Sequence, residues 1–368
     1  MLVALMLNLL FPVIAFANTS PHLKNVVVVG GTHGNEYTGV WCIKALDRAM
    51  DKVHKQYPSL NISTLLGNPE AYMQNKRFVH EDLNRQFSYD ALTRDLEDDD
   101  LPQETIRARE INAILGPKFP DDPDDPDHSH SAHVVIDLHS TTSNMGTTII
   151  VPIGDVVMTK AAAYVIKRCE EQGELVRCLV HTHPSKDVRP NLSSSGKHGF
   201  TIEVGPVPQG VLRHDAVEKT DMALHALLEF LGMYNTDEKA LNKKLDSMYK
   251  STGFKVPCFR SASAKRKGEM SGKISWPSVR ENPNFPAYMV HKHLQDSDFE
   301  PVETGDALFV DLDGNVIPYD GSHGSPIYLM FVNEGGYYYA SSGTGVSIAI
   351  ATEYDLHTGE LLEDNDEL

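Results

Sequence analysis

The chain has 368 residues, of which 41% are hydrophobic and 23% charged. This composition is typical of a globular protein long enough to bury a substantial core in one large or two smaller domains. The formal net charge is -18, which argues against a nucleic-acid partner because no basic excess exists to meet phosphates.

The four cysteines show no CxxC spacing. This pattern excludes zinc-finger and thioredoxin-type sites. We expect buried free thiols, with a Cys169–Cys178 pair as the alternative in an oxidising compartment.

Residues 1–17 resemble a secretory signal peptide. The segment "LVALMLNLLFPVIAFA" is apolar, too short to span a bilayer comfortably, and ends in the small-x-small pattern Ala15-Phe16-Ala17, although no Lys or Arg precedes it. The chain ends in "NDEL", a loose relative of the lumenal retention tetrapeptides. We therefore expect the secretory pathway or the ER lumen. The alternatives are a cytosolic protein with an uncleaved N-terminus, a mis-assigned start or a membrane-associating extension.

From residue 25 onward, strand-like and helix-like stretches alternate. The predicted strands cover residues 26–31, 61–69, 133–141, 147–153 and 199–206, and the predicted helices cover 37–53, 102–116, 159–173 and 214–235. This alternation predicts an α/β domain with a mostly parallel or mixed sheet, flanked by helices, over residues 24–245.

The composition changes after this domain. Residues 250–285 are rich in Gly, Ser, Pro and basic side chains, and short β-like segments with turns follow up to residue 355. We expect a small all-β domain over residues 250–355 and an acidic tail over 356–368. The acidic stretches "DLEDDD" and "PDDPDDPDHSHS" are most simply solvated insertions.

Chemically active side chains follow three of the predicted strands. His33 and Glu36 come after "VVVV", His139 ends a second apolar strand, and Glu203 lies near the end of a third. Ligands of open α/β sheets gather at the carboxyl ends of strands. Two histidines and one glutamate form the ligand set of a catalytic zinc hydrolase, and a remaining carboxylate can serve as general base for a zinc-activated water.

A single histidine after a strand is usually a hydrogen-bonded loop residue, so the prediction depends on the joint pattern. Asp137 is a candidate for orienting the metal site from behind. The segment "HSHSAH" (His128, His130 and His133) and the pair His181 and His183 could suggest a second metal site, but surface histidines are the simpler interpretation.

The blocks "GGTHGNEYTGV", "DLNRQF", "DLHSTTSNMG", "IEVGPVPQGVLR" and "FVNEGGYYY" together resemble the aspartoacylase family of zinc-dependent amidohydrolases. The similarity extends from about residue 24 to residue 340. It implies a zinc-carboxypeptidase-like α/β domain followed by a small β domain, one Zn²⁺ per subunit, a small-molecule N-acyl amino acid substrate and a homodimer.

The resemblance also implies a role for each matching residue. His33, Glu36 and His139 would bind zinc, and Glu203 would be the base that activates water and returns the proton to the leaving amine. Four further matches concern the substrate. Arg77 would polarise the scissile carbonyl, Asn84 and Arg85 would hold the α-carboxylate, and Tyr337 would bind the substrate from the second domain.

Two positions depart from the family pattern. Aspartoacylases carry, ten residues before the catalytic glutamate, an arginine that binds the side-chain carboxylate of N-acetylaspartate; this chain has Ser193. The local sequence is more similar to the branch that acts on N-acetylated aromatic amino acids and mercapturates. Arg189, four residues away, could substitute for the missing arginine. Ser140 stands where the family usually has Asn, so a contact near the acyl group could differ.

Hydrolysis of N-acyl aromatic amino acids or mercapturates is therefore the leading prediction. The first alternative is aspartoacylase activity with Arg189 in the role of the missing arginine. A zinc carboxypeptidase is the second, because Asn84 and Arg85 would equally suit a peptide's terminal carboxylate. A binding protein that has lost catalysis is the third.

Overall fold

The computed structural model describes residues 22–94, 101–119, 132–181, 188–262, 272–339 and 344–362. The signal-like segment and the NDEL terminus lie outside these ranges, as do His128, His130 and His183. No helix within the described ranges is both long and apolar enough to cross a membrane.

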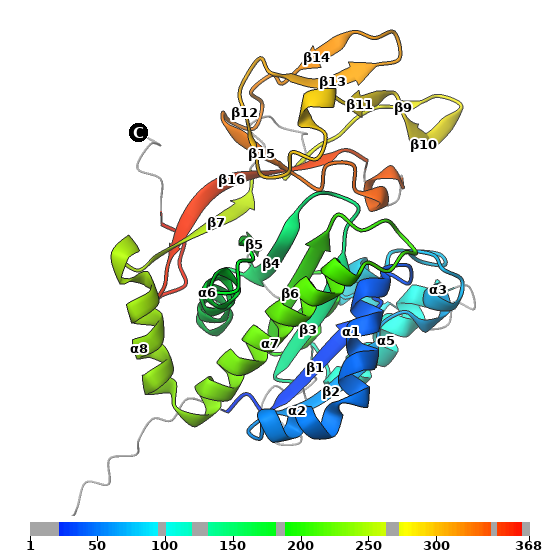
Figure 1. Cartoon of the computed structure of the whole chain (residues 1–368). Coiled ribbons are helices and arrows are strands. Elements are labelled where there is room, and N and C mark those ends of the chain that lie inside the picture. The colour runs from blue at the N-terminus through cyan, green and yellow to red at the C-terminus, as the bar shows by residue number, and fades with distance from the viewer. Residues whose placement is uncertain are drawn as a thin grey trace, which may run out of the picture.

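A mixed sheet forms the centre of the molecule (Figure 1). In the described part of the chain it has 11 strands, in the order β12-β15-β16-β7-β5-β4-β6-β3-β1-β2, with β8 paired to β16. The strands of its N-terminal half are β1 (Asn25–Gly30), β2 (Asn61–Leu66), β3 (Val134–Ser140), β4 (Gly146–Pro152), β5 (Val176–His181) and β6 (His198–Gly205). The strands β2, β1, β3 and β6 are parallel, and β4 runs antiparallel to β6. The α/β prediction is confirmed.

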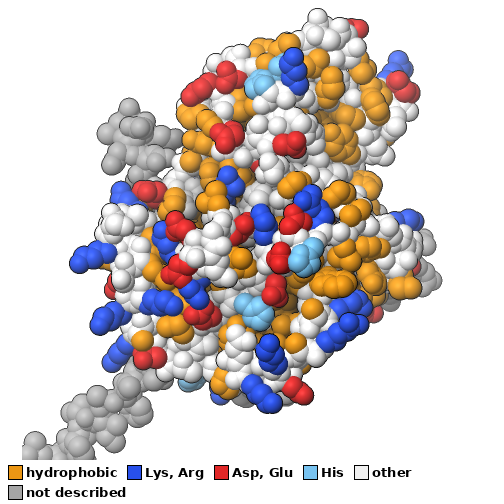
Figure 2. Space-filling view, viewed as in Figure 1, with side chains coloured by type: hydrophobic (Ala, Val, Ile, Leu, Met, Phe, Trp, Pro, Cys, Tyr) orange, Lys and Arg blue, Asp and Glu red, His pale blue; other side chains and the backbone are white. Residues whose placement is uncertain are grey.

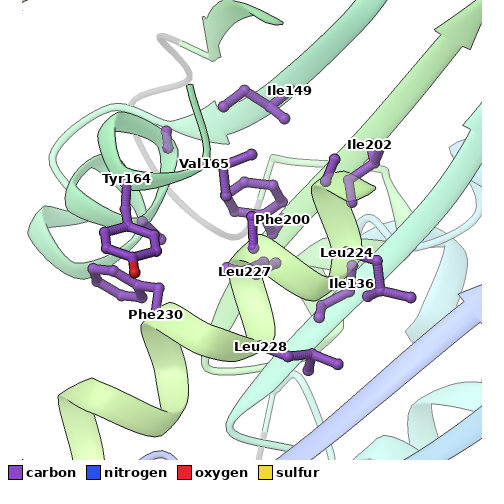
Figure 3. Close-up of a cluster of buried hydrophobic side chains, with 14 of the residues drawn as sticks. Ile136, Ile149, Tyr164, Val165, Phe200, Ile202, Leu224, Leu227, Leu228 and Phe230 are labelled. Atoms are coloured by element: carbon purple, nitrogen blue, oxygen red, sulfur yellow. The ribbon is translucent and has the colours of Figure 1, made fainter. Parts of the chain in front are cut away.

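Helices pack on both faces of this sheet. One face is covered by α1 (Tyr37–Arg48), α6 (Val156–Glu170) and α7 (His214–Thr236). Figure 3 shows this core, in which Leu224, Leu227 and Leu228 of α7 pack near Ile136, Phe200 and Ile202 of the strands. The other face of β1 and β3 packs against α5 (Gln103–Leu115). Burial on both faces explains the unbroken run of valines in β1.

Shorter helices complete this region. The predicted helix 37–53 is divided at Ala49, whose backbone leaves helical geometry (φ -103°, ψ 8°), into α1 and α2 (Met50–Gln56). The other short elements are α3 (Pro69–Met73), η1 (Leu83–Arg85), α4 (Tyr89–Thr93), η3 (Leu192–Ser195), α8 (Glu238–Tyr249) and η4 (Lys250–Thr252).

The C-terminal region is β-rich, as predicted, but its longest strands extend the central sheet. β7 (Lys255–Ser261) pairs with β5, and β16 (Val346–Asp355) pairs with β7. The sheet continues through β15 (Ile327–Met330), β12 (Pro301–Val302) and β8 (Lys273–Ile274). Strands from both sides of residue 250 therefore share one sheet. The division into domains at this position stays a prediction.

Two small sheets lie beyond this edge (Figure 1). They are formed by β9 (Ser278–Val279) with β10 (Asn282–Pro286), and by β11 (Tyr288–Val290), β13 (Ala307–Asp311) and β14 (Val316–Pro318). The 3-10 helices η5 (Lys292–Leu294) and η6 (Gly335–Tyr338) belong to the same region. A second hydrophobic cluster, which includes Trp276 and Phe309, gives this region its own core. All four cysteines of the chain are free and buried.

Candidate active site

The loop after β1 carries His33 and Glu36, which lie between the end of that strand and the start of α1. Gly31 has a φ of +72°, a conformation that L side chains rarely adopt. A Cβ atom on Gly34 would lie 2.2 Å from the carbonyl carbon of Ala71. The glycines therefore let the loop turn sharply and pack against α3, which brings His33 and Glu36 to the edge of the sheet.

His139 and Glu203 reach the same edge from two neighbouring strands. They are register partners in the parallel pair β3 and β6, so their side chains lie on one face of the sheet. The imidazole rings of His33 and His139 have their centroids 4.9 Å apart. The structure thus brings together the residues that the sequence placed at separate strand ends.

His33, Glu36 and His139 form a buried cluster that can hold a metal ion, since one ligand atom from each lies within 4.8 Å of the others. Both Nδ1 atoms point at the Glu36 carboxylate, at 2.6 Å from His33 and 3.0 Å from His139. The donor set of two imidazole nitrogens and one carboxylate fits Zn²⁺ with an open coordination position.

Two aspartates fix the orientation of the imidazoles. His33 Nε2 lies 3.1 Å from Asp82 Oδ1, and His139 Nε2 lies 2.8 Å from Asp137 Oδ2. Thr32 donates to the other oxygen of Asp137 at 2.6 Å. Histidines that bind a metal commonly contact a carboxylate through the second ring nitrogen, which orients the ring. The arrangement therefore fits a metal bound through Nδ1.

Arg77 lies buried beside this cluster. Its Nη1 donates to Glu36 Oε1 at 3.2 Å and to Glu334 Oε1 at 3.4 Å, and its Nη2 donates to Asp82 Oδ2 at 3.5 Å. Burial disfavours the charged guanidinium, but these three carboxylates and that of Glu203 outweigh burial and raise the pKa of Arg77. A cationic donor held in this way can stabilise negative charge that develops on a carbonyl oxygen.

Glu203 is a cavity-lining carboxylate that lies outside the His33–Glu36–His139 cluster. Burial, together with the nearby carboxylates Glu36 and Glu334, raises its pKa well above the usual range, against the opposing effect of His139 and Arg77. A buried carboxylate with a raised pKa is suited to accept and return a proton.

Glu334, from the C-terminal region, was not identified from the sequence as a site residue. Its carboxylate accepts hydrogen bonds from Thr141 Oγ1 at 2.5 Å, from Thr142 N at 2.9 Å and from Gly336 N at 2.8 Å, besides the one from Arg77. It therefore joins the loop after β3 to the C-terminal region and holds the guanidinium in place. The motif "FVNEGGYYY" contains Glu334, but the family resemblance implies a role only for Tyr337 within it.

We expect Glu334→Gln to lower kcat/KM about 10- to 100-fold and to lower the melting temperature. A neutral amide would bind the Arg77 guanidinium more weakly, and its NH₂ group would face N–H and O–H donors that now bond to the carboxylate. Steady-state kinetics and thermal unfolding measure the two effects. Glu353→Gln, which removes a surface ion pair with Lys255 at 3.6 Å, is the control and should behave like the wild type. Unchanged kinetics in Glu334→Gln would contradict this positioning role.

These groups surround one cavity of about 170 Å³. Its lining consists of the residues His33, Glu36, Arg77, Asn84, Arg85, His139, Ser140, Thr141, Ile150, Leu179, His181, Asn191, Thr201, Glu203, Phe331, Glu334 and Tyr337. The catalytic candidates, which come from four separate stretches of sequence, therefore line one cavity. Apolar side chains form part of its wall.

The predicted carboxylate-binding pair lies at this cavity. Asn84 Oδ1 accepts a hydrogen bond from Leu192 N at 2.9 Å, which joins η1 to η3. Arg85 is exposed, and its Nη1 donates to the Asn84 carbonyl at 2.9 Å. An exposed guanidinium at the border of a cavity is well placed to meet an entering carboxylate.

Tyr337 lines the cavity from the C-terminal region. Its hydroxyl lies 2.8 Å from Ser347 Oγ, and Lys273 Nζ lies 3.5 Å from the centroid of its ring. Burial, and then the charge of Arg85, lowers the pKa of Lys273 to about 8. The cation and the serine together fix the phenol ring.

Ser193 and Arg189 are not among the described residues that line the cavity. Ser193 is buried, its Oγ accepts a hydrogen bond from Asn191 Nδ2 at 2.6 Å, and it lies 3.3 Å from Thr201 Oγ1. Arg189 is half-buried, and its carbonyl accepts a hydrogen bond from the buried Lys118 Nζ at 2.6 Å. Asn191 and Thr201 thus separate Ser193 from the cavity.

The remaining predictions concern Ser140 and the other histidines. Ser140 lines the cavity and its backbone N–H donates to Glu36 Oε2 at 3.0 Å. His133 Nδ1 accepts from Asn25 N at 3.0 Å, a structural role. In the described ranges, no second group of His, Cys, Asp or Glu has the spacing of a metal site.

The fold and the site are those of a hydrolytic enzyme with a carboxypeptidase-like α/β sheet and a place for one metal ion. The chain belongs to the succinylglutamate desuccinylase/aspartoacylase family, whose catalytic-domain model matches residues 22–231. The model of the family's barrel-sandwich hybrid domain matches residues 270–345.

Similar proteins carry two kinds of name. A probable aspartoacylase of Nostoc is 36% identical over 86% of this chain and 93% of that protein. An N-acyl-aromatic-L-amino acid amidohydrolase (carboxylate-forming) of Xenopus laevis is 34% identical over 87% and 92%, and an aspartoacylase of Mus musculus is 34% identical over 86% and 89%. The crystal structure of murine aminoacylase 3 covers 94% of this chain and 99% of its own, with 27% identity and a TM-score of 0.71. The resemblance identified from the sequence motifs is confirmed.

Proposed function

We propose that this protein hydrolyses the amide bond of N-acyl L-amino acids with Zn²⁺ as cofactor, and that aromatic amino acids or mercapturates are the favoured substrates. The observation that carries the proposal is the position of Glu203 opposite His139, in one buried cavity with Arg77 and the His33–Glu36–His139 cluster. Relatives named for each of the two activities support the reaction class.

Each residue has one task in this reaction. Zn²⁺ bound by His33, Glu36 and His139 would supply Lewis-acid activation of water near neutral pH. Glu203 accepts a proton from the attacking water and returns it to the amine as the C–N bond breaks, which gives a carboxylate and a free amino acid. Arg77 donates to the carbonyl oxygen as it becomes negative.

The substrate's α-carboxylate would be held by Asn84 and Arg85, because a guanidinium suits a carboxylate. Tyr337 completes this side of the cavity. The homo-oligomer implied by the family resemblance stays a prediction.

Aspartoacylase activity is the second candidate. It would need a cation for the side-chain carboxylate, and neither Ser193 nor Arg189 lines the cavity. The apolar residues Ile150, Leu179 and Phe331 line it instead, which favours a larger uncharged side chain.

A substrate panel on the purified zinc-loaded protein tests the proposal. We expect kcat/KM for N-acetyl-L-tyrosine to exceed that for N-acetyl-L-aspartate by at least about 10-fold, because differential burial of a side chain has effects of this order. The reverse preference would establish the aspartoacylase alternative. Comparable turnover of a blocked tripeptide would indicate a carboxypeptidase. Bound zinc without any turnover would indicate a binding protein.

A further inference from the structure

We propose that Asp298 is a positioning residue for the active site: its carboxylate holds the turn at residues 331–334, and this turn places Glu334 on Arg77. The inference rests on the proposed function, because it concerns how the guanidinium that polarises the substrate's carbonyl is kept in place. Asp298 lies between η5 and β12 in the C-terminal region and is not among the described residues that line the cavity.

Asp298 is a buried carboxylate. Figure 2 shows acidic side chains spread over the surface of the molecule, where water solvates their charge. Asp298, in contrast, is only 5% exposed, and the next residue, Phe299, belongs to a hydrophobic cluster with Met145 and Met330. A charge in such surroundings costs free energy unless polar groups bind it. The groups that bind Asp298 therefore indicate what it does.

These groups belong to two segments of the active site. Asp298 Oδ1 accepts a hydrogen bond from Val332 N at 3.0 Å. Burial, together with Asp296, raises the pKa of Asp298 to about 6, against the opposing effect of the backbone N–H groups of Val332, Asn144 and Phe331. Asn144 lies in the loop between β3 and β4, and Phe331 lines the cavity. At pH 8 the carboxylate is therefore ionised and binds the turn that follows β15.

The turn at residues 331–334 needs such a contact because its backbone is strained. Glu334 N donates to the Phe331 carbonyl at 3.1 Å, which closes the turn. Phe331 and Asn333 have φ angles of +55° and +56°. Asn tolerates this conformation better than most residues, but an aromatic residue adopts it only where neighbouring groups fix the backbone. Val332, between these two residues, is the one that donates to Asp298.

The segment that carries Asp298 is strained in the same way. Asp296 and Phe299 have φ angles of +57° and +65°, so four of the six non-glycine residues with positive φ in the described ranges lie in these two segments. The segments also bind each other outside the carboxylate. Phe299 N donates to the Leu329 carbonyl at 2.8 Å, and Asn333 Nδ2 donates to Gln295 Oε1 at 2.6 Å. Strain of this kind concentrates at functional sites, where the surroundings hold it.

The strained turn ends at a residue that contacts the catalytic groups. Glu334 accepts hydrogen bonds from Arg77 Nη1 at 3.4 Å and from Thr142 N at 2.9 Å. Without the carboxylate of Asp298, Val332 N would lose its acceptor and the turn would relax toward an unstrained backbone. This relaxation would move Glu334 relative to Arg77. Asp298 therefore acts on the reaction through Glu334.

The test measures kcat and KM for N-acetyl-L-tyrosine at pH 8 with the zinc-loaded protein. We expect Asp298→Ala to lower kcat about tenfold with a smaller change in KM, because Arg77 acts on the carbonyl as the transition state forms. Asp298→Asn keeps an oxygen for Val332 and should retain at least about a third of the wild-type kcat. Asp298→Glu moves the carboxylate by one methylene and should also lower kcat, so the test does not depend on the folding of the alanine variant.

A double-mutant cycle separates this role from a general loss of stability. In the Glu334→Gln background, Asp298→Ala should lower kcat by no more than about twofold further, because the ion pair that Asp298 supports is already weakened. Val302→Ala is the matched control, since Val302 is fully buried in β12 of the same region. It should lower the melting temperature without changing kcat of the folded protein.

Three results would overturn the role of Asp298 while the proposed hydrolysis stands. They are wild-type kcat in both Asp298→Ala and Asp298→Glu, Asp298→Asn as slow as Asp298→Ala, and a further loss of about tenfold when Asp298→Ala is added to Glu334→Gln. Absence of turnover in the wild type would overturn the proposed function itself, and the role of Asp298 with it.

Discussion

Removal of divalent cations is expected to abolish the hydrolysis of N-acetyl-L-tyrosine, and addition of Zn²⁺ is expected to restore it at one ion per chain. The imidazoles of His33 and His139 and the carboxylate of Glu36 are held by the sheet, by Asp82 and by Asp137. Without the cation, no group in the cavity supplies comparable activation of water at neutral pH. Activity assays before and after treatment with a chelator, with the zinc content measured by mass spectrometry, check this result.

The ligands themselves provide the control for this experiment. His139→Ala should bind substoichiometric zinc and stay inactive at zinc concentrations that fully restore the wild type. Zinc should also raise the melting temperature of the metal-free wild type, because a ligand that binds only the folded state stabilises it, but not that of His139→Ala. Full activity in the chelated wild type, with no zinc detected, would remove the basis for a metal-dependent mechanism.

The positions of the candidate site residues could be predicted from the sequence because these residues follow buried strands. The valine run of β1 needs burial on both faces, and a parallel sheet collects strand ends at one edge. His33, Glu36, His139 and Glu203 could therefore be placed near one another without coordinates. Their meeting in one cavity is a consequence of this topology.

Partners that belong to a site through long-range contacts were not predicted. Glu334 binds Thr141 across 193 residues of sequence, and the approach of Asp82 to His33 depends on how the loop before η1 packs. The periodicity of the sequence contains no information about such contacts between residues far apart in the chain. Only the folded chain shows which carboxylates are buried beside the His33–Glu36–His139 cluster.

The extent of the sheet and the identity of the residues that line the cavity also could not be predicted from the sequence. The segment of β5 is short, and its strand conformation depends on pairing with β4 and β7. This pairing makes His181 a lining residue. In the same way, Asn191 precedes η3 and lines the cavity, whereas Ser193, within η3, does not.

Glu203→Gln is expected to lower kcat about 100- to 10,000-fold, because an amide cannot accept the proton of the attacking water or deliver it to the leaving amine. Gln is nearly the same size, so the cavity and the register between β3 and β6 should persist. Zinc content and melting temperature should therefore stay close to those of the wild type. Pre-steady-state and steady-state kinetics with N-acetyl-L-tyrosine measure the loss.

The changes in kcat and in KM that Glu203→Gln causes show whether Glu203 transfers a proton or has only a structural role. A structural defect would alter substrate binding and stability together, whereas loss of proton transfer lowers kcat and leaves the affinity for intact substrate nearly unchanged. Calorimetric titration of Glu203→Gln with N-acetyl-L-tyrosine should therefore show binding without turnover. The surface variant Glu353→Gln should show wild-type kcat. If Glu203→Gln retained more than about a tenth of the wild-type kcat, the proton would have to pass through another group, since general-base catalysis by this residue would account for too little of the rate.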